Sequence, residues 1–413
     1  MRAALLLALL TACAPEAARD TSSTAARADG APAGATAGDP CEPLETRRPN
    51  APDQEPAFEG QTRACAEPLG VRFRVEVVTD ALEAPWAVEP LPDGRLLVTE
   101  RTGQMRLVSA AGAVSAPLAG VTAVDDRGQG GLLDVALSPD FATDSTVFWS
   151  FSEPRGGGQN ATSVARGRLA GTALTGVRVI LRTTPAYDGD KHFGSRLAFG
   201  PDGMLYVTTG ERSDRETRPL AQSLDGHLGK VLRIAPDGSV PPDNPFADGA
   251  APEIWSYGHR NIQSAAFDTS GTLWTVEHGP AGGDELNRIE PGVNYGWPVQ
   301  SFGEEYSGMR IRTAETDREG IRAPVYYWDP VIAPSGAEVY TGDMFPAWQG
   351  SLFVGALREQ RLVRLTLSDG RVAGEEHLLV DRRQRVRDVR QGPDGALYVV
   401  TDSGELWRLT RES

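Results

Sequence analysis

The chain has 413 residues, of which 40% are hydrophobic and 23% are charged, so it is long enough to bury a large core. Its formal net charge of -15 at pH 7 argues against nucleic acid as a partner and against binding to an anionic membrane surface by bulk charge. Small neutral or cationic substrates are compatible with this charge.

Residues 1–12 predict a signal peptide of the lipoprotein type. One basic residue precedes an apolar run over residues 3–10, which is too short to span a bilayer permanently. The letters LTAC, ending at Cys13, resemble a bacterial lipobox, which implies cleavage before Cys13 and a lipid on its thiol group. Ordinary cleavage near Ala12 or Ala14 without a lipid is the alternative. We therefore expect an exported, periplasmic protein that meets a membrane only through a lipid anchor.

Residues 13–70 are predicted to form a flexible tether, which the lipid on Cys13 would attach to a membrane. They are rich in Ala, Gly, Thr, Pro and charged side chains and have no apolar periodicity, so burial cannot offset the entropy lost on ordering them. Cys41 and Cys65 lie within this stretch, and an oxidising compartment favours a disulfide between them. Such a bond closes a local loop and takes no part in chemistry.

From Val71 onward one unit recurs along the chain. A turn of the Pro-Asp-Gly type is followed by an alternating strand of branched and aromatic residues, as in LPDGRLLVTER from Leu91 and GPDGMLYVTTGE from Gly200. The turns of the six units are marked by Gly94, Asp144, Gly203, Gly271, Gly350 and Gly395. Their spacing matches one four-stranded propeller blade with loops of variable length.

The repeats predict an all-β protein, a six-bladed β-propeller with four-stranded blades over residues 71–413, whose two ends meet in one blade. A pair of β-sandwiches is the alternative, but it does not explain why one turn-strand unit recurs along the whole chain. Helical periodicity is confined to residues 221–231, where a short helix is expected.

His192 is a candidate general base. It stands in the segment DGDKHFGSRLAFGPDG, in a loop just before the third strand unit, where a propeller directs side chains toward its central channel. An imidazole group is the usual general base near neutral pH. A structural role is the alternative for a lone histidine.

Arg385 and Arg387 form a candidate anion site. They alternate in RQRVRDVR, so a strand projects both to one face, where two guanidinium groups suit carboxylates. The alternative is a solvated basic strand paired with the acidic surface. In an otherwise acidic chain, this pair indicates a small ligand with several negative charges.

The segment 252–298 groups many polar residues around one short strand. It contains Arg260 and Asn261, the turn formed by Gly279 and Pro280, and the acid Glu285. Carbonyl and carboxylate oxygens are the ligands that Ca²⁺ prefers. A calcium site is one interpretation of these residues, and a glycine-rich turn beside solvated acids is the other.

Taken in order, the motifs of residues 71–411 resemble those of the soluble pyrroloquinoline-quinone (PQQ) dependent sugar dehydrogenases, most closely the bacterial aldose sugar dehydrogenase branch. The motifs are GQGGLLDVALSPDF from Gly128, KHFGSRLAFGPDGMLYVTTGE from Lys191, YGHRN from Tyr257, EHGPAGGDELN from Glu277 and RVRDV from Arg385.

The resemblance implies a role for each matching residue. His192 would remove the proton of the anomeric hydroxyl group of an aldose while hydride passes to the quinone, and Arg260 would polarise the accepting oxygen. The implied cofactor contacts are Gln129, Arg260, Asn261, Arg358, Arg385 and Arg387. The implied calcium ligands are the carbonyls of Gly279 and Pro280 for the ion at the cofactor, and Glu285 and Tyr295 for a structural ion.

Two residues depart from the family pattern. Arg358 stands where the family commonly has a lysine, and Lys191 stands where the glucose-specific branch has an acid. We expect a PQQ- and calcium-dependent, monomeric dehydrogenase that oxidises aldoses to lactones and passes electrons to an external acceptor. A calcium-dependent hydrolase of the lactonase type and a non-catalytic propeller that binds a glycan or a partner are the alternatives.

Overall fold

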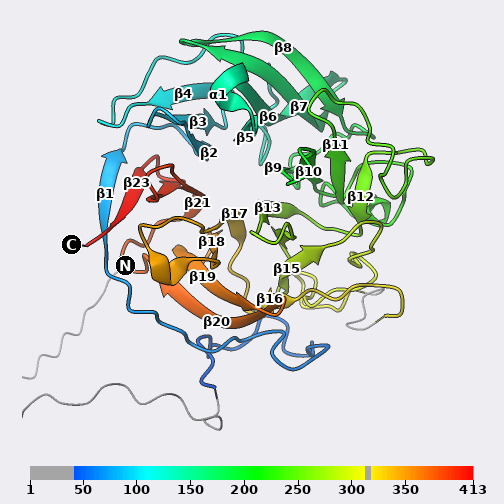
Figure 1. Ribbon diagram of the computed structural model, residues 1–413. Coiled ribbons are helices and arrows are strands. Elements are labelled where there is room, and N and C mark those ends of the chain that lie inside the picture. The colour runs from blue at the N-terminus through cyan, green and yellow to red at the C-terminus, as the bar shows by residue number, and fades with distance from the viewer. Residues whose placement is uncertain (1–40, 312–317, 413) are drawn as a thin grey trace, which may run out of the picture. The chain divides into compact units, whose positions relative to one another are not determined.

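The structure is a computed structural model that describes residues 41–311 and 318–412. Six antiparallel sheets surround a central axis, as Figure 1 shows, so the predicted six-bladed β-propeller is confirmed. The expected signal peptide, Cys13 and the tether up to residue 40 lie outside the described residues. Within residues 41–311 and 318–412, no helix has both the length and the apolar character needed to cross a membrane.

One blade differs from the prediction of four strands. It has three strands, β2 (Pro85–Pro90), β3 (Leu96–Glu100) and β4 (Gln104–Val108). Val114 forms only a single bridge with Val108 where a fourth strand would lie.

The other five sheets have four strands each. In chain order, the next two sheets are β5 (Leu132–Leu137), β6 (Thr146–Gly156), β7 (Gln159–Ala170) and β8 (Ala173–Arg182), then β9 (Gly194–Phe199), β10 (Leu205–Thr209), β11 (Lys230–Ile234) and β12 (Ile254–Tyr257). They are followed by β13 (Ile262–Phe267), β14 (Leu273–Glu277), β15 (Asp284–Ile289) and β16 (Tyr326–Trp328), and by β17 (Pro334–Val339), β18 (Leu352–Ala356), β19 (Arg361–Ser368) and β20 (Arg371–Leu378). The last sheet joins β21 (Val386–Gln391), β22 (Leu397–Thr401) and β23 (Leu406–Arg411) to β1 (Phe73–Thr79), which pairs with β23, so the two ends of the propeller meet in one blade as expected.

The recurring turn starts the second strand of every sheet. Gly203, for example, has φ +74°, a left-handed conformation that glycine adopts without steric cost, and β10 begins two residues later. The alternating residues that follow are buried on both faces, because neighbouring sheets pack on either side. In this way the repeated sequence unit produces the repeated blade.

The short helix expected over residues 221–231 is absent. This stretch contains the end of the 3-10 helix η1 (Arg218–Ala221), a series of turns and the start of β11. The buried ammonium group of Lys230 accounts for the difference, since it donates to the carbonyls of Leu220 and Ala221, which a helix would use for itself. The other helices described are α1 (Phe141–Asp144) and the 3-10 helix η2 (Pro346–Trp348).

Residues 41–70, called here the N-terminal segment, are not the flexible tether that their composition predicts. They run along the outer side of β16 and β20 in Figure 1, and Ala51 and Gln61 are 1% and 0% exposed. The expected Cys41–Cys65 disulfide is present. Main-chain hydrogen bonds join Glu375 to this segment at Cys65 and Glu67. These hydrogen bonds help to order the N-terminal segment, which has too few apolar side chains to be ordered by burial alone.

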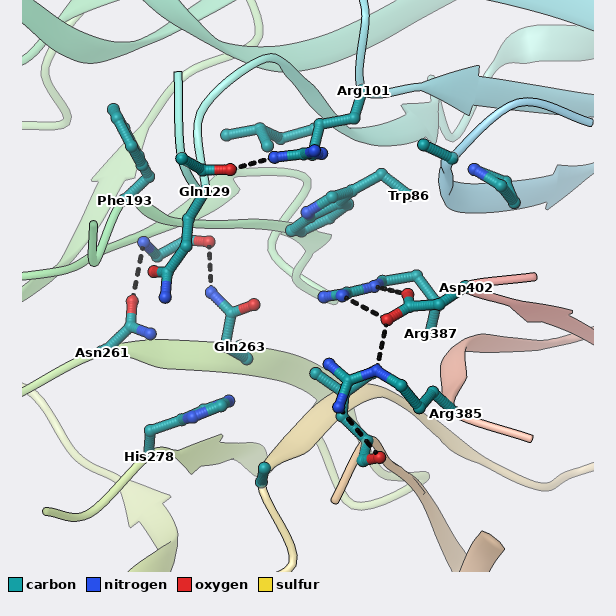
Figure 2. A pocket seen from close by; sticks show the side chains of 17 residues that line it. Trp86, Arg101, Gln129, Phe193, Asn261, Gln263, His278, Arg385, Arg387 and Asp402 are labelled. Atoms are coloured by element: carbon teal, nitrogen blue, oxygen red, sulfur yellow. Dashed lines mark hydrogen bonds and ion pairs between the residues drawn. The ribbon is translucent and has the colours of Figure 1, made fainter. Parts of the chain in front are cut away.

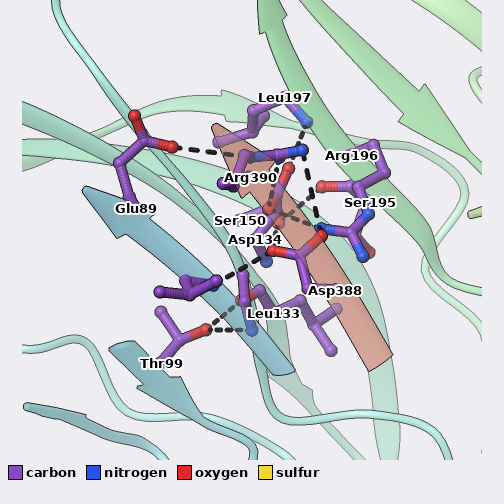
Figure 3. Close-up of polar contacts among 12 residues, drawn as sticks. Glu89, Thr99, Leu133, Asp134, Ser150, Ser195, Arg196, Leu197, Asp388 and Arg390 are labelled. Atoms are coloured by element: carbon purple, nitrogen blue, oxygen red, sulfur yellow. Dashed lines mark hydrogen bonds and ion pairs between the residues drawn. The ribbon is translucent and has the colours of Figure 1, made fainter. Parts of the chain in front are cut away.

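The first strands of the six sheets contact one another in a closed ring, and buried charges connect them (Figure 3). Arg196 of β9 lies 2.9 Å from a carboxylate oxygen of Asp134 on β5 and 3.0 Å from one of Asp388 on β21. Arg390 lies 3.6 Å from Glu89 at the edge of this cluster, where burial raises the pKa of Glu89 to about 8. The cluster ties together sheets that are far apart in sequence.

Candidate active site

A cavity of about 440 Å³, a size typical of small-molecule sites, is lined by side chains from all six sheets and the loops beside them (Figure 2). Because neighbouring strands of each sheet are antiparallel, the start of its first strand and the end of its second strand lie at the same end of the axis. The lining residues come from these positions. They include Trp86, Arg101, Gln129, Phe193, Asn261, Gln263, His278, Ala333, Leu357, Arg385, Arg387 and Asp402.

His192 is held directly beside this cavity, although it does not itself line it. Its backbone has φ +49°, which is uncommon for a residue other than glycine, and its main-chain N–H donates to Gln129 Oε1 at 2.9 Å. Asn261 Oδ1 accepts the N–H of Gly194 at 3.1 Å. Two of the predicted cofactor contacts therefore also fix the loop that carries the predicted base.

The imidazole group of His192 is paired with Glu211, a residue that the sequence analysis did not identify. Nδ1 lies 2.9 Å from Glu211 Oε2, so Nδ1 carries the proton and Nε2 keeps its lone pair. Burial would raise the pKa of Glu211, but His192 and Arg260 hold it below its ordinary value. Burial lowers the pKa of His192 despite the opposing effect of Glu211. His192 is thus a neutral, oriented base.

Arg260 lies next to this pair and contacts the predicted calcium turn. Its Nη1 donates to Gly279 O at 2.7 Å and to His278 O at 3.1 Å, and its guanidinium group stacks 5.2 Å from the ring centre of Trp297. The carbonyl of Pro280 accepts no hydrogen bond from the described residues. A cation at this turn would therefore find the Pro280 carbonyl free and the Gly279 carbonyl shared with Arg260.

Asp402, another residue missed from sequence, joins Arg385 and Arg387 on the opposite wall of the cavity. Its two carboxylate oxygens lie 2.7 Å from Arg385 Nε and 2.7 Å from Arg387 Nε, as Figure 2 shows. Arg385 Nη2 and Arg387 Nη1 make no hydrogen bond with any described residue, since the bonds of these side chains use the other nitrogens. The guanidinium groups of Arg385 and Arg387 are therefore fixed in place, and each keeps unpaired N–H donors that could bind an anionic ligand. The side chain of Arg358 is exposed and is not among the lining residues.

Glu285 lies on a polar face formed by β14 and β15. It is the register partner of Glu277, and burial, followed by repulsion from Glu277, raises the pKa of Glu285 well above its ordinary value. Thr275 Oγ1 and Asn287 Oδ1, on the same face, are buried without a hydrogen-bond partner. Two carboxylates and two unsatisfied oxygens in one place fit a hard cation.

Tyr295, the other expected ligand of a structural calcium, is close to this face but uses its hydroxyl group elsewhere. The hydroxyl group donates to Arg288 O at 2.6 Å and accepts from Glu290 N at 2.9 Å. The ring stacks on His259, which in turn contacts Glu277. A metal ligand at Tyr295 would therefore have to be its main-chain carbonyl.

The geometry can be compared with known proteins. The model of the glucose/sorbosone dehydrogenase family matches residues 82–408. Aldose sugar dehydrogenase YliI of Escherichia coli (strain K12) is 44% identical over 345 residues, which are 81% of this chain and 92% of that protein. The apo form of the soluble aldose sugar dehydrogenase of Escherichia coli has a TM-score of 0.79 and covers 83% of this chain and 100% of its own. The PQQ-bound aldose sugar dehydrogenase of Streptomyces coelicolor, 34% identical, has a TM-score of 0.68 and covers 83% and 99%.

Proposed function

The chain belongs to the glucose/sorbosone dehydrogenase family, and we propose that it is a PQQ- and calcium-dependent dehydrogenase that oxidises the anomeric hydroxyl group of an aldose to a lactone. One observation carries the proposal. On one wall of a single cavity, Arg385 and Arg387 are fixed in place and have free N–H donors. Beside the opposite wall lies the buried, neutral imidazole group of His192, which the Glu211 carboxylate orients.

PQQ suits this cavity by charge. It has three carboxylates, and the lining residues offer Arg101, Arg385 and Arg387 against the single carboxylate of Asp402. Asn261 and Gln129 add amide groups at the wall next to His192. When bound there, PQQ would supply the two-electron acceptor for the hydride of the sugar.

The residues of the chain would then divide the remaining work. His192 Nε2 would take the proton of the anomeric hydroxyl group, and Glu211 would stabilise the imidazolium ion that forms. Arg260 would place positive charge where the accepting oxygen becomes negative. The carbonyls of Gly279 and Pro280 would hold Ca²⁺, which acts as a Lewis acid.

Reconstitution tests this function directly. Purified protein stripped with a chelator would be mixed with PQQ and Ca²⁺, and reduction of a redox dye would be followed with a panel of mono- and disaccharides. We expect reduction only when PQQ, Ca²⁺ and an aldose are all present. If no sugar in the panel reduces the dye, the proposed function is wrong.

No observation favours the alternative calcium-dependent hydrolase. Such a site would gather several acidic side chains on one ion, whereas within residues 41–311 and 318–412 no group of three or more His, Cys, Asp or Glu side chains is placed to hold a metal. The polar face at Glu285 has two acids, and its other oxygens come from Thr275 and Asn287.

The polar face gives a prediction for the metal-free protein. Glu285→Gln is expected to raise the melting temperature in EDTA at pH 8 and to change it little at pH 5. The pKa of Glu285 is raised in the folded protein, so the folded protein becomes less stable as pH rises above 4.5, the ordinary pKa of this carboxyl group. Ca²⁺ should stabilise the wild type and not the variant.

Differential scanning fluorimetry at both pH values, with EDTA or with Ca²⁺, measures this effect. Glu290→Gln is the matched control, because Glu290 directly follows the same strand and pairs with Arg322 instead. If the wild type and Glu285→Gln respond equally to Ca²⁺, the polar face holds no calcium.

We also propose that the protein is exported, carries a lipid on Cys13, acts as a monomer and passes electrons to an external acceptor. The proposal rests on the sequence of residues 1–13 and on the need of a reduced quinone for reoxidation. Mass spectrometry of the mature protein is expected to find a lipid-modified N-terminal Cys13. An unmodified N-terminus downstream of Cys13 would contradict the anchor.

A further inference from the structure

The N-terminal segment contacts the loop of residues 279–283 from behind. The main-chain N–H groups of Asn50 and Ala51 donate to Asp329 Oδ1 at 2.5 Å and Oδ2 at 3.1 Å. A Cβ atom added to Gly282 would lie 3.0 Å from Ala51 Cβ and 3.2 Å from Asp329 Oδ2. The loop is thus packed tightly against both residues, and a side chain at Gly282 would require them to shift.

The 279–283 loop follows directly on His278, which lines the active-site cavity. Arg260 donates to the carbonyl of Gly279, and Asp284 Oδ1 accepts the N–H of Gly279 at 2.8 Å. The second oxygen of Asp284 accepts the N–H of Ala333, which lines the cavity. The loop is therefore connected to cavity-lining residues through His278 and Asp284, and it packs against the N-terminal segment at Gly282.

Several bonds keep the N-terminal segment in place at this contact. Asn50 Oδ1 accepts the N–H of Val331 at 3.0 Å, and Arg63 donates to the carbonyl of Asp329 at 3.1 Å. The Cys41–Cys65 disulfide closes the stretch that contains Asn50 and Ala51, which limits the conformations open to it. The segment lies outside residues 82–408, the range that the family model matches.

We propose that Asp329, Asn50 and Ala51 are positioning residues for the 279–283 loop, and that the N-terminal segment thereby sets the affinity of the cavity for Ca²⁺. This inference rests on the proposed function, which assigns the carbonyls of Gly279 and Pro280 to calcium. Residues that orient metal ligands from behind commonly change metal affinity by about 10- to 100-fold when they are replaced.

The test is the Ca²⁺ concentration at which half of the protein has bound PQQ, followed without substrate by quenching of tryptophan fluorescence. Asp329→Ala is expected to raise this concentration about tenfold or more, because it removes the acceptor of both N–H groups. Asp329→Asn keeps an oxygen acceptor and should recover part of the loss. Ala51→Gly removes only a methyl group, is expected to fold, and should raise the concentration by a smaller factor.

Gln61→Ala is the matched control. It removes a buried side-chain hydrogen bond between the same segment and Pro324 O, at a place where Gln61 has no contact with the 279–283 loop. We expect it to lower the melting temperature and to leave the Ca²⁺ requirement unchanged. A merely structural role of the segment would make both kinds of variant alike.

The possible failures are distinguishable. If wild-type protein takes up no PQQ with Ca²⁺ present, the proposed function fails and this inference fails with it. If the wild type needs Ca²⁺ for PQQ binding and Ala51→Gly and the folded Asp329 variants need the same concentration, the function stands and the positioning role is wrong. Should Asp329→Ala not fold, Ala51→Gly and Asp329→Asn decide the question.

Discussion

Replacing His192 by alanine is expected to lower kcat by roughly 100- to 10,000-fold, the contribution of a general base, while PQQ binding changes little. The reason lies in the geometry. The neutral imidazole group of His192, which would act as the base, lies beside the cavity, whereas Arg385 and Arg387, which would hold the cofactor, lie on the opposite wall. Steady-state kinetics at saturating PQQ and Ca²⁺, with a separate PQQ titration, measures the two effects.

His227→Ala is the control for this experiment. His227 also pairs with a carboxylate, lying 3.1 Å from Glu253, but it is not among the residues that line the cavity. Its replacement should leave kcat close to that of the wild type in folded protein. A His192→Ala enzyme with wild-type turnover on every sugar tested would overturn the mechanism.

The pH dependence of kcat/KM tests the same role of His192 as the base. Burial lowers the pKa of His192, so the neutral form persists below the ordinary value of 6.5. We therefore expect the acid limb of kcat/KM to lie below pH 6.5 in the wild type. Glu211→Gln should move this limb to lower pH, because it removes the negative charge that raises the pKa of His192 against the effect of burial.

The sequence predicted those features that repeat or that belong to one continuous motif. The turn around Gly203 specifies the strand after it through local backbone preferences, and the same holds in every blade. Gln129, Asn261, Arg385 and Arg387 were found because each stands in a recognisable motif, and all four line the cavity.

The partners of these residues were not predictable from sequence. Glu211 and Asp402 follow the second strands of their sheets, and the antiparallel pairing of β9 with β10 and of β21 with β22 brings them to His192 and to Arg387. Glu100 and Glu277 end the second strands of other sheets, so an acid at this position does not by itself mark a partner. The N-terminal segment was misread for a related reason. Its order depends on hydrogen bonds to distant residues such as Asp329, which composition does not reveal.

Arg196 supports the floor of the cavity from below. Its guanidinium group lies 4.1 Å from the ring centre of Trp86, and its Nε donates to Gln263 O at 2.7 Å. Nη2 donates to Arg387 O at 3.3 Å. The same side chain is the counter-charge of Asp134 and connects three sheets (Figure 3). Its loss should therefore affect both the fold and the site.

Arg196→Met is expected to lower the free energy of unfolding by about 3–5 kcal/mol at pH 7, because it leaves Asp134 and Asp388 buried beside a vacated charge. Urea denaturation measures this loss. Burial already raises the pKa of Asp134, and removing Arg196 raises it further. Between the raised pKa of Asp134 in the wild type and its still higher pKa in the variant, only the folded variant keeps the proton. The stability difference between the two proteins should therefore grow as pH rises through this range and shrink as pH falls below it.

Arg233→Met is the control for the loss of an arginine as such. Arg233 pairs with the solvent-exposed carboxylates of Asp202 and Asp243. Its replacement should therefore lower the free energy of unfolding by less, and with little dependence on pH. Arg196→Met should also weaken PQQ binding, through the displaced Trp86 and Arg387, whereas Arg233→Met should not. An Arg196→Met protein as stable as the wild type at pH 7 would mean that Arg390 alone neutralises the two aspartates, and the ion cluster would then not be what fixes the floor of the cavity.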